Sequence, residues 1–143
     1  MDVLSGVLAL GGAMLFGVGA IVLLLWSLIG ALVIQLATKM VAGFKPGYGI
    51  AFLTALVAVI AGACVNYGLG MALSTMAFAW AICLVVAIAV EAAIIGFMIK
   101  NPQGTALGFA KGLLVTVIEI VIMTVLFVGV PLLLLSLLGG GAH

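Results

Sequence analysis

The sequence has very little charge. Lysine, arginine, aspartate and glutamate together make up 5% of its 143 residues, arginine is absent, and the net charge is +1. Because 69% of the residues are hydrophobic, the chain has too few polar side chains to cover a folded surface in water. This composition excludes an ordinary soluble domain. It also excludes nucleic-acid binding, which requires a basic face.

Residues that carry out catalysis are scarce as well. The only histidine, His143, is the last residue, and no Ser-His or Cys-His arrangement or H-E-x-x-H motif occurs. Cys64 and Cys83 lie inside apolar runs, where we expect small core residues rather than a disulfide or a metal site. We therefore expect neither an enzyme nor a bound metal or cofactor.

What the sequence does contain is four long hydrophobic runs. A membrane-spanning helix needs about 20 predominantly apolar residues in succession. We predict an all-α polytopic integral membrane protein that forms a single transmembrane domain. Its four helices are expected at about residues 13–38, 50–69, 76–99 and 107–130.

The first and last hydrophobic runs are longer than one span requires. A break at Gly11-Gly12 in the first run would leave an interfacial N-terminal segment; a single, strongly tilted helix is the alternative. This run lacks the basic start of a cleavable signal, so we expect it to be retained as a transmembrane segment. In the last run, Pro131 is the expected point for a bend or an end.

All four lysines lie at the first and third connections between the predicted helices. The second connection, near residues 70–75, has none, and it is so short that the flanking helices should be antiparallel neighbours. By the positive-inside rule, the lysine-bearing turns face the cytoplasm and both termini lie outside, in what we expect to be a bacterial cytoplasmic (inner) membrane. The residues at this cytoplasmic interface are Lys39, Lys45, Lys100 and Lys111.

Small residues recur every four positions in two places. Such a stripe lets a neighbouring helix approach closely in lipid, where water does not drive helices together. We therefore predict a helix-packing seam at each place. One seam consists of Gly104, Gly108 and Gly112, and the other consists of Ala58, Gly62, Asn66 and Gly70.

The two halves of the chain are similar to each other. A shift of 57 residues lays Gly47 on Gly104 and Phe52 on Phe109, which predicts two parallel-repeat hairpins. The second half contains EAAIIGFMIKNPQGTALGFAKGLLVTVIEIVI and resembles small uncharacterised bacterial four-helix membrane proteins made of two tandem helical hairpins. That resemblance implies a fold and no activity.

A second comparison is with the proteolipid subunits of rotary ATPase rotor rings. Their four-helix forms are also duplicated, glycine-rich hairpins with a buried carboxylate. In this chain Gly11, Gly12, Gly17 and Gly19 give only a fragment of the dense glycine helix of that family. Two acidic residues, not one, lie in the predicted spans. We therefore do not assign the chain to that family.

Glu91 and Glu119 are the acidic residues of the predicted spans. Glu91 lies nine residues before Lys100, and Glu119 lies eight residues after Lys111. At 1.5 Å per residue, both carboxyls are about 12 to 14 Å from the lysine level. A charged side chain near the bilayer centre costs at least about 2.5 to 3.5 kcal/mol and usually faces a bundle interior or a cavity. We expect both acids to point inward at one depth.

Two interpretations of this pair remain open. Adjacent carboxyls could share a proton or hold a cation, which would make a proton or cation site. Alternatively, protonated carboxyls could hydrogen-bond a carbonyl, Thr116, Thr124 or Asn66 and serve helix packing. Lys111 is expected to extend to the cytoplasmic interface, although its spacing from Glu119 would also allow an ion pair.

The leading functional prediction is a non-catalytic membrane subunit, a scaffold or accessory component. Because the loops are short, nearly all of the surface should be helix facing the lipid bilayer, and partners should bind within it. The expected partners are further copies of this chain, as a homo-oligomer, or a larger membrane-protein complex. The alternative is a component of a proton- or cation-conducting channel or transporter that uses Glu91 and Glu119.

Overall fold

The protein is helical throughout the residues that the computed structural model describes, 3–139, apart from the connecting turns. Its elements in order are α1 (Val3–Ala42), α2 (Tyr48–Ala72), α3 (Ala79–Met98), α4 (Phe109–Thr124), the π-helix η1 (Val125–Gly129) and α5 (Val130–Gly139). Because α4, η1 and α5 form one continuous stretch, the described chain has four stretches that are long and apolar enough to cross a membrane. The predicted fold class, an all-α membrane protein with four spanning helices, is confirmed.

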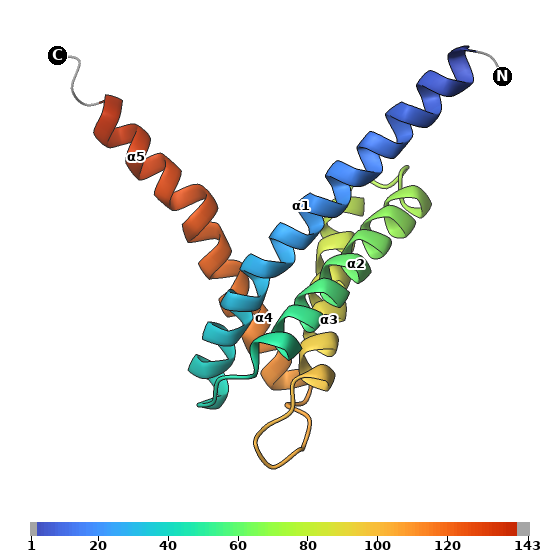
Figure 1. Cartoon of the computed structure of the whole chain (residues 1–143). Helices are drawn as coiled ribbons and strands as arrows, with labels where there is room; N and C mark the ends of the chain where they lie inside the picture. The colour runs from blue at the N-terminus through green and yellow to red at the C-terminus, as the bar shows by residue number, and fades with distance from the viewer. Residues whose placement is uncertain (1–2, 140–143) are drawn as a thin grey trace.

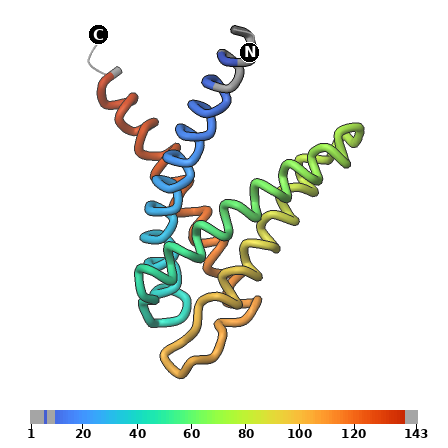
Figure 2. Tube along the Cα trace, turned by 45° about the vertical axis from the view of Figure 1, so that its right-hand side comes forward, coloured from blue at the N-terminus to red at the C-terminus, as the bar shows by residue number. Residues whose placement is uncertain are grey.

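The helices converge at one end of the molecule and diverge at the other (Figure 1 and Figure 2). α1 packs against α2 and α4, and α3 packs against the same two helices, so the four form a closed ring of neighbours. The turns at residues 43–47 and 99–108 lie at the converging end. From there α1, α5 and the α2–α3 hairpin extend as three arms, and α5 contacts only η1.

The buried core lies at the converging end. Its largest side chains include Ile34 of α1, Ile95 and Ile99 at the end of α3, and Val115 of α4, each with 0% of its surface exposed. Lipid is as apolar as these side chains, so no hydrophobic gain drives them together in a membrane. Close packing has to hold this end of the bundle.

α3 and α4 approach so closely that their backbones touch. A Cβ atom at Gly112 would overlap the carbonyl oxygen of Ala92 and would lie 2.8 Å from the Gly96 nitrogen. Just before α4, the N–H of Gly108 donates a hydrogen bond of 3.0 Å to the carbonyl oxygen of Gly96. Backbone atoms, and not side chains, therefore join the two helices here.

The predicted helical seam of Gly104, Gly108 and Gly112 is wrong for its first two members. α4 begins only at Phe109, and both earlier glycines lie in the loop before it, with φ of 84° and 85°. Glycine suits these angles because it lacks the Cβ that would be strained there. The four-residue spacing thus combines two turn glycines with one glycine that packs against α3.

The predicted break at Gly11-Gly12 is also wrong, because α1 runs without interruption from Val3 to Ala42. In lipid, a broken helix would leave backbone groups without water to bond, at several kcal/mol each, whereas a glycine costs only about 1 kcal/mol relative to alanine. The N-terminal segment is therefore not a separate interfacial element. The 40 residues of α1 form the single helix of the alternative prediction and extend about 60 Å at 1.5 Å per residue, about twice the thickness of a bilayer core.

Pro131 does not end the last helix, contrary to the predicted boundary near residue 130. The helical stretch continues to Gly139, and the π-helix Val125–Gly129 directly precedes the proline. In an α-helix the proline ring collides with the carbonyl four residues back. Here the Val130 N–H donates to the Val125 carbonyl, five residues back. This wider turn changes the direction of the carbonyls that precede the proline, including the one with which its ring would collide.

Replacing Gly112 with alanine should destabilise the α3–α4 contact. The new Cβ would overlap the Ala92 carbonyl, and overpacking of this kind costs about 1 to 3 kcal/mol. The matched control is Gly49→Ala in α2, where a Cβ meets nothing within 4 Å. The measurement is the unfolding midpoint in a titration of mixed detergent micelles with a denaturing detergent. Equal midpoints for the two variants would contradict the contact.

Candidate functional site

Glu119 lies in the interior of the bundle, where α4 passes α1. Its side chain is 8% exposed. Gly30 of α1 lies beside it: a Cβ there would be in ordinary contact with Glu119 Oε1, at 3.9 Å, and in a tighter contact with the Ala55 Cβ, at 3.3 Å. Oε2 of Glu119 is buried and has no hydrogen-bond partner among the described residues. The carboxyl is therefore enclosed by protein but not satisfied by it.

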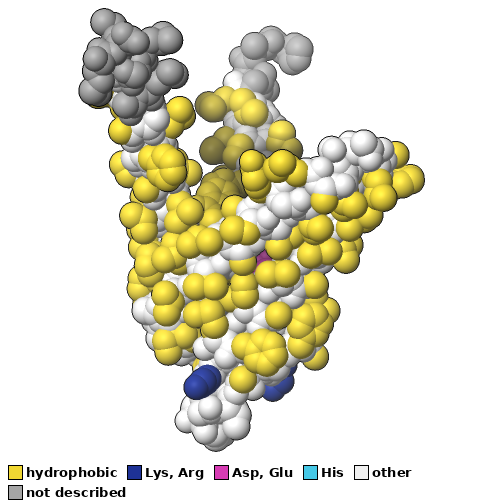
Figure 3. Space-filling view, turned by 90° about the vertical axis from the view of Figure 1, so that its right-hand side faces the viewer, with side chains coloured by type: hydrophobic (Ala, Val, Ile, Leu, Met, Phe, Trp, Pro, Cys, Tyr) yellow, Lys and Arg dark blue, Asp and Glu magenta, His cyan; other side chains and the backbone are white. Residues whose placement is uncertain are grey.

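Glu91 of α3 lies beside a cavity of about 310 Å³. Small and apolar residues of α2 and α3, together with Trp26 of α1 and the amide of Asn66, form its walls. Trp26 and Ala58 line the cavity at Glu91, whereas Gly30 and Ala55, about one turn away on the same two helices, lie beside Glu119, so both predicted acids face the same part of the bundle. An acidic side chain is visible between hydrophobic ones about halfway along the face in Figure 3.

The described polar side chains do not satisfy the pair. Thr116, Thr124 and Asn66, the partners considered in the packing interpretation, each donate to a carbonyl of their own helix, over 2.7–3.1 Å. Lys111 lines a pocket at the converging end, about two helical turns from Glu119. An unpaired carboxylate in a low-dielectric interior costs several kcal/mol. The pair therefore has to be neutralised, by protons or by a bound cation.

No protein family, curated protein or solved structure matches this chain. The resemblance to small two-hairpin bacterial membrane proteins stays a prediction. Function therefore has to be inferred from the geometry of the site. Among residues 3–139, no three His, Cys, Asp or Glu side chains come together as metal ligands.

The small-residue seam predicted on α2 borders hollow space over most of its length. Ala58 is buried, at 8% exposed, but a Cβ at Gly62 or Gly70 would meet nothing within 4 Å. Asn66 and Gly70 line a second cavity, of about 390 Å³, between α2 and α3. The predicted close contact is therefore found only at the Ala58 end. Small residues permit contact where helices converge, and they leave a groove where helices diverge.

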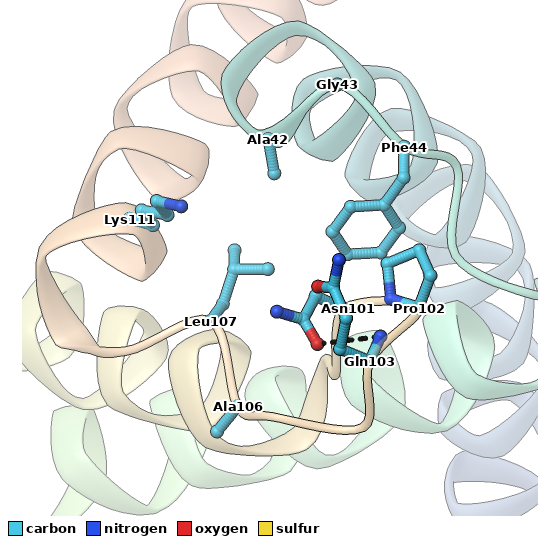
Figure 4. A pocket seen from close by; sticks show the side chains of 9 residues that line it. All are labelled: Ala42, Gly43, Phe44, Asn101, Pro102, Gln103, Ala106, Leu107 and Lys111. Atoms are coloured by element: carbon cyan, nitrogen blue, oxygen red, sulfur yellow. Dashed lines mark hydrogen bonds between the residues drawn. The ribbon is translucent and has the colours of Figure 1, made fainter.

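The lysine side chains on the face in Figure 3 lie at the converging end, and the rest of that face is largely hydrophobic. A pocket of about 350 Å³ lies there, with Lys111 on one side and Phe44 and Pro102 on the other (Figure 4). The loop before α4 is held by Asn101, whose Oδ1 accepts a hydrogen bond of 3.1 Å from the Gln103 N–H. The buried core separates this pocket from the carboxyl pair.

Two aromatic residues near the acids were not among the predicted site residues. Trp26 lines the Glu91 cavity, and its ring stacks against Phe127 of η1 with centroids 5.0 Å apart. Gly12, Gly19 and Trp26 are seven residues apart in the sequence. That heptad spacing places them on one face of α1, and it is the signal that could have singled out Trp26.

The different burial of the two acids predicts different reactivity toward dicyclohexylcarbodiimide, an apolar reagent that modifies protonated carboxyls. Glu91 lies on a cavity wall, whereas Glu119 is 8% exposed and lies behind it. We expect Glu91 to be modified several times faster in membranes, as measured by mass spectrometry of the resulting peptides. Glu91→Gln is the control that should remove the adduct. Faster modification of Glu119 would show that the arrangement is wrong.

Proposed function

We propose that this protein is a non-catalytic subunit of a membrane assembly, joined within the bilayer to further copies of itself or to other membrane proteins. The observation that carries this proposal is one face of α1. Near the C-terminal end of α1 this face packs inside the bundle. Near the N-terminal end it contacts no other described element.

This face, which we name the α1 glycine face, contains Gly12, Gly19 and Gly30. At 100° per residue, Gly12 and Gly30 point in the same direction and Gly19 lies within about 20° of them. Gly30 is packed inside the bundle, whereas a Cβ at Gly12 or Gly19 would meet nothing within 4 Å. A shallow hollow, walled only by side chains of α1 itself, runs along residues 15–24 of the same region.

Glycines on one face of a membrane helix are typical of close helix contact. Each costs about 1 kcal/mol relative to alanine in a helix interior, and a close helix contact can offset that cost. α5 does not cover this face, since it contacts only η1, and Figure 1 shows the two arms apart. A transmembrane helix from another chain is the partner that such a face fits.

The proposed orientation puts the converging end in the cytoplasm and both termini outside a bacterial cytoplasmic membrane. The positive-inside rule supports it, because all four lysines belong to the two turns at that end or to the helix ends beside them.

The α1 glycine face should crosslink to protein in membranes. A photoreactive benzoylphenylalanine in place of Phe16, which lines the hollow along this face, is expected to give a protein adduct seen as a band of higher mass. Gly19→Leu should remove most of that adduct, because the added side chain keeps a partner helix away. The photoreactive residue and the leucine are introduced together in the full chain.

The matched control is Gly17→Leu, the same change on the other side of α1. Gly17 lies about 160° from Gly19 around the helix, and a Cβ there also meets nothing within 4 Å. This variant should keep the adduct. An absent adduct at position 16, or equal loss in both variants, would reject the proposed contact.

A second candidate function is proton or cation handling by Glu91 and Glu119, as part of a channel or transporter. The buried Glu119 Oε2 without a partner favours it. Two neighbouring acids that must be neutralised in the membrane can take up and release protons, or can bind a cation between them.

Glutamine substitutions test this second function. Glu91→Gln and Glu119→Gln keep the shape of a protonated carboxyl but cannot exchange a proton, so we expect ion flux in liposomes to fall to the vesicle background with assembly unchanged. Asp2→Asn makes the same acid-to-amide change outside the spans and should leave the flux intact. Normal flux in both variants would reject the function, and lost assembly would assign the acids to packing.

A further inference from the structure

The two cavities beside α2 and α3 join into one groove. The cavity at Glu91 and the cavity nearer the α2–α3 turn share Asn66 and Ala87 in their walls. The outer cavity reaches Gly70 and Trp80, next to that turn. We name this continuous space the α2–α3 groove. It extends about 18 Å, which is the rise of α3 from its first residue to Glu91 at 1.5 Å per residue.

Small and polar side chains line much of the groove, and larger apolar ones, Trp26, Val59, Trp80 and Leu84, complete it. The small and polar set includes Ala58, Gly62, Asn66 and Gly70 on α2, and Ala79, Cys83, Ala87 and Glu91 on α3. On each helix these residues are spaced four apart, which keeps them on one side of it. A water molecule occupies about 30 Å³, so cavities of about 390 and 310 Å³ have ample room for water.

The groove is closed beyond Glu91. On α3, Ala92 and Ile95 on the lysine side of Glu91 are fully buried. On α2, which forms the other wall, Ala55 and Thr54 on the lysine side of Ala58 are buried as well, at 3% and 0% exposed. The groove therefore leads from the α2–α3 turn to Glu91 and stops there, and it approaches this acid from the end of the bundle opposite the lysines.

We propose that the α2–α3 groove is a water-filled access path through which protons reach Glu91 from the membrane face opposite the lysines. The inference rests on the second candidate function and adds a route and a side to it. A hydronium ion in the groove transfers a proton to the ionised Glu91 carboxylate and becomes water; release is the reverse. Glu119, whose buried Oε2 has no partner among residues 3–139, lies in the bundle interior beside Gly30.

Asn66 supplies a polar group midway along the route. Its Nδ2 donates a hydrogen bond of 2.9 Å to the Gly62 carbonyl, which leaves Oδ1 to accept one from water. A lipid acyl chain is the competing occupant of such a groove, and it would exclude water. The access path therefore requires that water, and not a lipid acyl chain, fills the groove.

Cys83 is a natural probe, because it lines the groove and, at 7% exposed, can be reached by a reagent only through it. A Cys64→Ser variant leaves Cys83 as the only cysteine. A charged, membrane-impermeant methanethiosulfonate reacts with the thiolate, which forms in water and not in lipid. In liposomes we expect Cys83 to be labelled from the face opposite the lysine-bearing turns. We also expect the attached group to slow proton flux, because it narrows the groove.

Further single cysteines, each introduced into the Cys64→Ser, Cys83→Ser double variant, test how far the water path extends. Ala87→Cys, deeper in the groove, should react within about tenfold of the Cys83 rate, and Ala55→Cys, in the buried core, should react at least about tenfold more slowly. Gln103→Cys marks the lysine face of the oriented vesicles.

Three results would overturn the access path. They are an unlabelled Cys83, labelling of Cys83 from the Gln103→Cys face, and labelling only by an apolar maleimide, which would mean that lipid fills the groove. Expected labelling with normal flux through Glu91→Gln would overturn the second candidate function and the proton path with it. Lost flux in Glu91→Gln with an unlabelled Cys83 would overturn this route alone.

Discussion

The backbone contact between α3 and α4 fixes the geometry on which the rest of the bundle depends. It lies within about two helical turns of both acids, since Glu91 precedes Gly96 by five residues and Glu119 follows Gly112 by seven. Two backbones in contact have no side chain between them that could yield. The converging end is therefore closed, the acids are held near each other, and the helices diverge only beyond them.

Lipid as the solvent explains which parts of the fold could be predicted from the sequence. Four apolar runs separated by lysines and turn residues were sufficient for four helices. The ends of the outer helices were not predictable from glycine and proline, because those residues interrupt helices mainly where water can bond the freed backbone groups. At Gly11-Gly12, α1 continues without a break. At Pro131 a π-helix accommodates the missing donor, and the helix continues to Gly139.

The part of the candidate site that follows from residue spacing along the helices could be predicted from the sequence. A similar depth for Glu91 and Glu119 is expected from their distances along the helices to the lysines, and in the fold both acids lie against the same parts of α1 and α2. The role of the small residues was not predictable, because it depends on the angle between neighbouring helices. Gly112 lies where α3 and α4 converge and makes a contact. Gly62 and Gly70 lie where the hairpin and its neighbours leave space, and they line cavities.

The two proposed functions meet at Trp26. This residue belongs to the same side of α1 as Gly12 and Gly19, and it also forms part of the wall of the Glu91 cavity. A partner helix lying along the α1 glycine face would therefore end beside the acids. It would replace lipid at the open side of the bundle with protein, where polar groups and ordered water can be accommodated at membrane depth. In this fold, assembly within the bilayer and access to a buried carboxyl pair are thus compatible, because the contact that brings in a partner helix also completes the wall around the acids.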